Sequence, residues 1–208
     1  MKVSIQHRGL SMVLLVILLA GCASPSQPTR FYRLDGGAPN IRAQDLMPAL
    51  NRSMLGVEEV SVAAYLDRPQ IVERVAEHRL KLHEFDQWAG SFQENLKIVL
   101  GEELQRLMPE RPVVTSPWPG SRQPDYRLEL MVRQFDWVGD RIIVRGNWSL
   151  IREKPRELVA LQRVGLEEPI LGSGIDAVVA ASHRSMGRWA QIIADWFRDA
   201  AGRPGDSP

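Results

Sequence analysis

Alternating apolar and polar positions mark two consecutive strands in the second half of the chain, and a third strand is expected directly after them. In the first two, apolar side chains recur with the two-residue period of a strand that has one buried face. The strands are expected over residues 126–135, 142–151 and 158–166. Turn residues, among them Gly139-Asp140, separate them, so the pattern predicts an antiparallel meander.

The first half of the chain contains shorter segments with a similar pattern. Segment 55–62, LGVEEVSV, is rich in β-branched residues, which favour strands. Further short strands are expected over residues 31–34, 70–76, 79–85 and 113–114. Together with the meander, these segments are enough to form one sheet.

Two segments have the 3.6-residue apolar period of an amphipathic helix. The first is expected over residues 86–108, with Asp86 as its N-cap and Pro109 ending it. The second is expected over residues 175–200, after the glycine-rich segment 172–174. Helices of small domains usually cover their own sheet, so both apolar stripes are predicted to pack there.

The order of these elements predicts one α+β domain, in which two amphipathic helices pack on one face of a mixed or antiparallel sheet. The chain has 208 residues, of which 44% are hydrophobic and 25% charged. That composition suits a single folded core. No internal repeat or second boundary is visible, so the domain is expected over residues 31–201, followed by a disordered tail over residues 202–208.

The first residues have the pattern of a bacterial lipoprotein signal. Lys2 and Arg8 precede an unbroken apolar run over residues 12–20. The run is too short for a bilayer core, which needs about 20 apolar residues, but it fits a signal peptide. The sequence LAGC at residues 19–22 contains the only cysteine and resembles a lipobox. The alternatives are an ordinary secretory signal with a chance cysteine, or a buried helix.

The lipobox resemblance implies that residues 1–21 are removed and that Cys22 becomes the acylated first residue. Several long acyl chains hold a protein durably on a membrane. Residues 22–30 are then expected to form the lipidated tether of the domain. Residue 23 is alanine, whereas aspartate at this position retains enterobacterial lipoproteins at the inner membrane. The resemblance therefore predicts an outer-membrane lipoprotein on the periplasmic side.

Charge gives no reason to expect a nucleic-acid partner. The chain has 26 basic and 25 acidic residues. Removing the signal takes away two basic residues and no acidic one, which leaves 24 against 25. A domain this close to neutrality lacks the basic surface that nucleic acid or anionic lipid attracts.

Candidate chemistry is sparse. The single cysteine excludes a disulfide within the chain and a cysteine-rich zinc site. His78 and His83 are expected to be surface histidines on opposite faces of a strand, which disfavours a shared metal. The chain has no G-x-x-x-x-G-K-[ST] loop, so an ATPase would be another protein. We expect no catalytic residue, metal or cofactor; the enzymatic alternative is a hydrolase that uses His183 with a serine such as Ser185.

Two of the six tryptophans lie where an exposed ring could contact lipid or a partner. Trp118 lies between prolines in the loop 116–124, and Trp137 lies at a strand end. The alternative is that each ring packs under its own loop.

The middle of the chain resembles the ABC-transport auxiliary lipoproteins, the PqiC/YmbA-like group. The centre of the match is YLDRPQIV at residues 65–72, followed by Glu84, Phe85 and Trp88. The second half is similar at Phe135, Gly139-Asp140, Trp148-Ser149-Leu150 and Gly172-Ser173. With the lipobox, the likeness covers nearly the whole chain.

The resemblance implies a non-enzymatic accessory of an intermembrane lipid or lipophile transport system. Such lipoproteins work with an inner-membrane protein bearing MCE domains and with its permease and ATPase, and the acylated Cys22 would hold this chain in outer-membrane lipid. A homo-oligomer would suit the end of a conduit, although no residue demonstrates one. A cell-envelope assembly or scaffold lipoprotein is the alternative, and the lipid-anchored hydrolase is a third.

The segment Tyr65–Pro69 is open to two interpretations. Pro69 fixes its own φ and restricts Arg68, so the segment can be a rigid turn. It can also be a docking loop, because tyrosine and arginine are enriched at interface hot spots. The candidate partner-binding residues are Tyr65, Leu66, Asp67, Arg68 and Pro69.

Overall fold

A computed structural model describes residues 27–35, 53–118 and 123–201 of the chain. The expected signal peptide, Cys22 and the expected C-terminal tail lie outside the described residues. None of the helices within the described part is long and apolar enough to cross a membrane.

The meander forms as the alternation predicts, with longer strands. It consists of β6 (Tyr126–Val138), β7 (Arg141–Glu153) and β8 (Arg156–Pro169), paired antiparallel in that order. Gly139 has φ of +57° in the tight turn between β6 and β7, a conformation that glycine adopts without steric cost. Leu128, Leu150 and Trp148 are fully buried on the inner face.

The other five strands complete one mixed sheet. They are β1 (Arg30–Tyr32), β2 (Leu55–Val62), β3 (Gln70–Ala76), β4 (Arg79–Trp88) and β5 (Val113–Thr115). The sheet has the order β1-β4-β3-β6-β2-β5, and β7 and β8 extend it from β6. The strand β2 runs parallel to β5 and β6, β1 runs parallel to β4, and β3 and β4 form an antiparallel hairpin.

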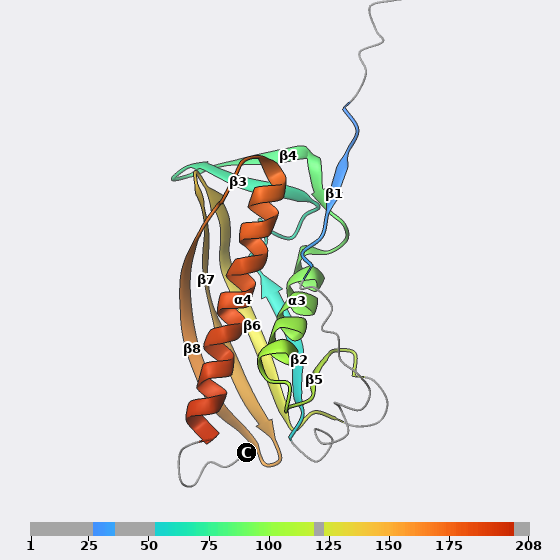
Figure 1. Ribbon diagram of the computed structural model, residues 1–208, viewed down its shortest axis with the longest axis vertical. Coiled ribbons are helices and arrows are strands. Elements are labelled where there is room, and N and C mark those ends of the chain that lie inside the picture. Colours follow the sequence, from blue (N-terminus) through green and yellow to red (C-terminus); the bar gives the residue numbers. More distant parts are fainter. Residues whose placement is uncertain (1–26, 36–52, 119–122, 202–208) are drawn as a thin grey trace, which may run out of the picture.

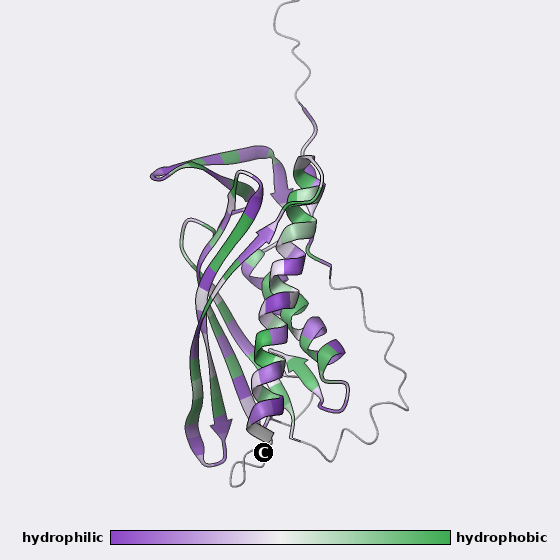
Figure 2. Cartoon of the chain, turned by 60° about the vertical axis from the view of Figure 1, so that its left-hand side comes forward, coloured by the Kyte–Doolittle hydropathy of each residue, from purple (hydrophilic) through white to green (hydrophobic). Residues whose placement is uncertain are grey.

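Two helices, α3 (Phe92–Leu107) and α4 (Gly174–Ala201), lie against one face of the sheet (Figure 1). Green apolar and purple polar stretches alternate along both helices and along the long strands in Figure 2. Leu96, Leu100 and Leu104 of α3 meet Trp189 and Ile193 of α4 in one core. The predicted fold class, a single α+β domain with two helices on a mixed sheet, is confirmed.

The predicted start of the first helix is wrong. Asp86 does not cap a helix, because β4 continues through Trp88 and pairs there with β1. The N-cap is Ser91, whose hydroxyl oxygen accepts from the Glu94 backbone nitrogen at 3.3 Å. The buried ring of Trp88 satisfies both a strand and a helix pattern, so periodicity alone could not place the boundary.

Candidate functional site

The segment Tyr65–Pro69 connects β2 to β3 and is held by backbone hydrogen bonds at both ends. The Leu66 nitrogen donates to the Ala63 oxygen at 2.8 Å, and the Arg68 nitrogen donates to the Leu66 oxygen at 2.9 Å. At the far end the Trp88 nitrogen donates to the Pro69 oxygen at 2.7 Å. The segment is therefore an ordered connection with its backbone fixed to the sheet.

Tyr65 points into the domain and donates to a buried carboxylate. Its hydroxyl lies 2.7 Å from Asp136 Oδ1, and Asp136 on β6 has no exposed surface. Arg74 Nε on β3 donates to Asp136 Oδ2 at 2.5 Å, and Gln134 Nε2 donates to the same oxygen at 2.7 Å. We call Tyr65, Arg74, Gln134 and Asp136 the Asp136 cluster. Three donors on one carboxylate offset the cost of burying its charge.

The electrostatics of the cluster favour the neutral phenol of Tyr65. Burial, followed by the hydrogen bond to Asp136, raises the pKa of Tyr65 to about 12. The hydrogen bond to Asp136 also raises the pKa of the Arg74 guanidinium above its ordinary value. Tyr65 therefore stays a hydrogen-bond donor at neutral pH and exchanges no proton there, which suits a structural fastening rather than acid–base chemistry.

The remaining candidate residues divide between the inside and the outside of the domain. Leu66 is buried in the core, whereas Asp67 and Pro69 are exposed. Arg68 is half-buried, and its buried Nε atom has no hydrogen-bond partner among the described residues. The segment thus anchors itself through Tyr65 and Leu66 and presents Asp67, Arg68 and Pro69 outward.

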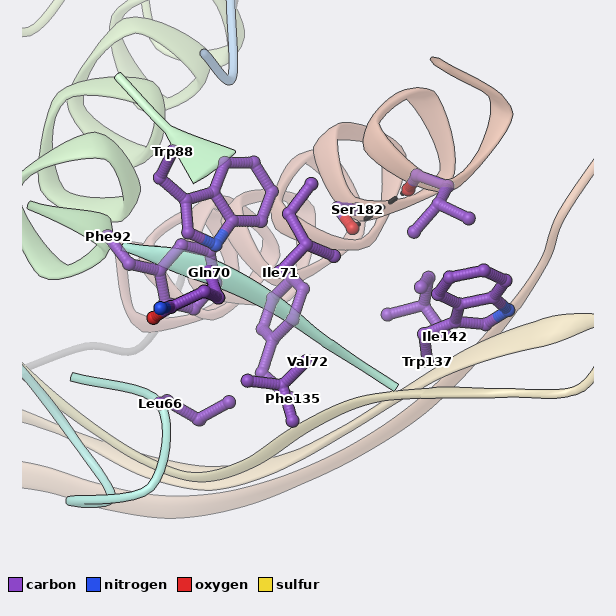
Figure 3. A pocket seen from close by; sticks show the side chains of 11 residues that line it. Leu66, Gln70, Ile71, Val72, Trp88, Phe92, Phe135, Trp137, Ile142 and Ser182 are labelled. Atoms are coloured by element: carbon purple, nitrogen blue, oxygen red, sulfur yellow. Dashed lines mark hydrogen bonds between the residues drawn. The ribbon is translucent and has the colours of Figure 1, made fainter. Parts of the chain in front are cut away.

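A small apolar cavity lies directly beneath the segment (Figure 3). Its lining residues include Leu66, Gln70 and the stacked rings of Trp88 and Phe92. The cavity volume is about 20 Å³, which is room for a single water molecule. An acyl chain does not fit this cavity.

A second, polar hollow of about 180 Å³ lies between β2 and the start of α3. Its residues come from segments more than 30 positions apart, so no local sequence pattern indicates it. Its carboxylates Glu58 and Glu94 pair with Arg127 and Lys97, at 2.8 Å each. No group of three metal-ligating side chains occurs within the described residues.

The two histidines of the β3–β4 hairpin lie in different environments. His78 is exposed in the turn between β3 and β4, as predicted for a surface histidine. His83 is more enclosed than predicted: its side chain is 13% exposed, its Nε2 lies 2.9 Å from Glu73 Oε2, and its ring stacks on Trp137 at 5.0 Å. The stacking on β6 covers one side of the ring, which sequence alternation within β4 does not reveal.

His183 and Ser185 are not brought together as a nucleophile and base. The hydroxyl of Ser185 is fully buried and donates to the Ala181 oxygen of its own helix at 2.9 Å. His183 Nε2 instead lies 3.4 Å from Glu103 Oε1 across the contact between α3 and α4. Because the Ser185 hydroxyl is buried and already hydrogen-bonded, it does not serve as a nucleophile in this geometry.

The two candidate tryptophans are partly buried, and each ring packs against another strand of the domain rather than under its own loop. Trp137 Nε1 donates to the Gly139 oxygen at 2.8 Å while its ring stacks on His83. The ring of Trp118 lies over Gly56 of β2, where a Cβ atom would come within 2.6 Å of it. Gly56 therefore provides the space that this ring occupies.

The contact between Asp136 and Tyr65 could not be predicted from the sequence. The two residues are separated by 71 positions, so no local pattern connects them. The one available signal is the position of Asp136 between the aromatic residues Phe135 and Trp137, directly after the strand expected over residues 126–135.

Residues 32–194 of the chain match the family of the ABC-type transport auxiliary lipoprotein component. No curated protein matches the chain.

Two crystal structures have similar folds. One, of an uncharacterized protein, has a TM-score of 0.66 and 20% identity, and the match covers 82% of this chain and 99% of the other. The second, protein XCC0632 from Xanthomonas campestris, has a TM-score of 0.61 and 18% identity, with coverage of 81% and 94%. At these identities the structures establish the fold alone.

Proposed function

From the premise that this chain belongs to the family of ABC-type transport auxiliary lipoprotein components, we propose that it docks an inner-membrane MCE-domain protein to the outer membrane. The transport system would carry a lipid or another lipophile between the two membranes. The chain would act as a non-enzymatic accessory of a permease and ATPase formed by other proteins.

The observation that supports the docking role is that the segment Tyr65–Pro69 is held in one conformation by its hydrogen bonds. Tyr65 fastens the segment to the Asp136 cluster, and three backbone hydrogen bonds fix its course. A loop that is ordered before binding loses less conformational entropy when a partner arrives. The segment carries Asp67 and Pro69 exposed and Arg68 partly exposed, and arginine is a frequent hot-spot residue.

The membrane assignment is supported by the sequence of the N-terminus. Cys22 ends the lipobox-like segment, and alanine follows it. We propose that acylated Cys22 holds the domain at the outer membrane. Confinement to the membrane plane raises the effective concentration of the docking loop near a partner that crosses the periplasm.

The small cavity supports a positioning role rather than a carrier role. Its volume of about 20 Å³ holds no lipid tail, whereas drug-sized ligands occupy roughly 300 Å³ or more. We therefore propose that cargo passes through the partner's conduit and that this domain holds the outer-membrane end of it.

A photo-crosslinking experiment tests the docking role. A photoreactive amino acid replaces the exposed Asp67 in the full-length lipoprotein in its own cells, and a second strain carries it at the exposed Gln162 on β8. We expect irradiation at position 67, and not at position 162, to join the chain to an MCE-domain protein, which mass spectrometry identifies.

Two substitutions sharpen this test. Arg68→Ala is expected to lower the crosslinking yield at least fivefold, while Arg163→Ala, an exposed arginine on β8, leaves it unchanged. Crosslinks to outer-membrane assembly or cell-wall proteins instead would support the scaffold alternative and refute the docking role. Equal yields at positions 67 and 162 would also refute it.

A further inference from the structure

Exposed apolar side chains gather at one end of the domain. Phe31 on β1 is 65% exposed, and Phe85 on β4 and Val75 on β3 are also exposed. Leu171, three residues before α4, is 69% exposed. The elements that carry these residues lie together at the upper end in Figure 1. We call Phe31, Val75, Phe85 and Leu171 the apolar end.

Both phenylalanines lie exposed beside buried residues of the paired strands β1 and β4. Phe31 lies opposite Gln87 in the parallel pair, and Phe85 lies in the stretch of β4 between His83 and Gln87 where the register with β3 shifts. Asp86 and Trp88, which flank Gln87, are buried. The two exposed rings are therefore carried by neighbouring strands at the same end of the sheet.

The position of the apolar end relative to the anchor indicates what it contacts. Arg30, the first residue of β1, follows Cys22 by eight residues. Eight residues of fully extended chain span at most about 28 Å. An acylated Cys22 therefore keeps β1, and Phe31 with it, close to the surface of the bilayer.

Three cations on or directly after the strands that carry the apolar end form ion pairs within the domain. Arg30 forms a bidentate pair with Asp86 at 2.7 and 3.0 Å, Arg33 lies 3.5 Å from Asp35, and Lys81 lies 3.2 Å from Glu73. These cations do not form a free basic patch for anionic lipid. Aromatic and aliphatic side chains that stand exposed beside paired charges suit the interface of a neutral bilayer.

We propose that the apolar end is a membrane-contact site, in which Phe31, Phe85 and Leu171 enter the headgroup region of the bilayer that holds Cys22. The acyl anchor supplies the attachment, and the apolar end fixes the orientation of the domain on it. Tyr65–Pro69 is then carried at a set angle to the membrane. The inference rests on the lipid anchor of the proposed function.

Because the chain has a single cysteine, a second cysteine introduced at the apolar end can be labelled specifically. In the acylated lipoprotein the Cys22 sulfur is blocked, so a cysteine introduced by Phe31→Cys is the only free thiol. The matched control is Leu158→Cys, because Leu158 is 58% exposed and lies near the β7–β8 turn at the opposite end. A Leu171→Cys variant tests the same end while leaving Phe31 in place.

Each labelled protein carries an environment-sensitive fluorophore and is reconstituted into phosphatidylcholine–phosphatidylethanolamine vesicles with brominated lipid. We expect labels at positions 31 and 171 to be quenched at least threefold and shifted to the blue, with no change in 0.5 M salt. The label at position 158 should be unaffected. Mass spectrometry of the acylated chain confirms the anchor independently, so a failure of the contact site is distinct from a failure of the anchor.

Two results would overturn the inference. Equal quenching at positions 31 and 158 would show that the domain has no preferred orientation. A blue shift at position 31 without quenching by brominated lipid would show that a protein surface, such as a second copy of the chain, covers the apolar end.

Discussion

Two carboxylates of this domain are bound by the same pair of residue types and yet lie in different surroundings. Asp136 accepts from Arg74 and Tyr65, and Asp86 accepts from Arg30 and Tyr32. We call Arg30, Tyr32 and Asp86 the Asp86 cluster. Each cluster joins segments more than 50 positions apart in the chain.

The two clusters differ mainly in how much water reaches them. The side chain of Arg74 is 25% exposed and Asp136 is fully buried, whereas the side chain of Arg30 is 63% exposed. The hydrogen bonds of Arg30 lower the pKa of Asp86. Asp86 is itself buried, but its partner Arg30 is mostly exposed, and solvent around that guanidinium reduces the contribution of the pair to stability. The same three residue types therefore stabilise the segment Tyr65–Pro69 strongly through Asp136 and the short edge strand β1 more weakly through Asp86.

Removing the two carboxylates in turn gives the largest expected difference. Asp136→Ala leaves Arg74, Gln134 and Tyr65 without their common acceptor, and we expect a loss of about 3 to 5 kcal/mol in the free energy of unfolding. For a domain of this size that lowers Tm by at least about 6 °C. Asp86→Ala is expected to cost clearly less, because Arg30 can turn into solvent. Urea and thermal unfolding of both variants measure the difference.

A compensated variant keeps this prediction testable if Asp136→Ala fails to fold. The triple variant Tyr65→Phe, Arg74→Met, Asp136→Leu removes the buried polar groups together, and apolar replacements of similar volume are often tolerated. We expect it to recover much of the lost stability. Equal losses for Asp136→Ala and Asp86→Ala would contradict the role assigned to burial.

A smaller difference is expected when only the tyrosine hydroxyls are removed. Tyr65→Phe deletes a 2.7 Å hydrogen bond to a buried carboxylate, and we expect a loss of about 1.5 kcal/mol. Tyr32→Phe deletes a longer bond of 3.2 Å in the Asp86 cluster, and a loss below about 1 kcal/mol is expected. Chemical denaturation of the two variants side by side measures both values; a larger loss for Tyr32→Phe would reverse the comparison.

The parts of this fold that could be predicted from sequence are those in which one pattern extends over many residues. The strands β6 and β7 each alternate over about ten positions, so one buried face determines both. The boundary between β4 and α3 could not be predicted in this way. Asp86 has the chemistry of an N-cap, and only its pairing with Arg30, 56 positions earlier, keeps it in a strand.

The same difference between local patterns and contacts of distant segments applies to the candidate site. A proline after Arg68 indicates an ordered turn, and the backbone hydrogen bonds of that segment agree with it. The carboxylate that receives Tyr65 lies on another strand, and the apolar end depends on the parallel register of β1 and β4. Contacts between distant segments follow from the packed sheet, so neither feature could be inferred from local sequence.

The smallest effect that separates the clusters is the titration of their tyrosines. A free phenol has a pKa near 10, and burial against Asp136 raises that of Tyr65 to about 12. Because the folded state holds the proton more tightly, the stabilisation from this group is complete below pH 10 and is lost as pH rises toward 12. The pKa of Tyr32 is also raised, by burial and by its hydrogen bond to Asp86.

The chain has three tyrosines, so subtracting the phenolate absorbance of Tyr65→Phe from that of the wild type isolates the titration step of Tyr65. We expect the Tyr65 step about two pH units above the ordinary value of a phenol. It should also lie above the step that is isolated in the same way with Tyr32→Phe. A Tyr65 step near pH 10 in the folded protein would mean that the phenol is not held against Asp136.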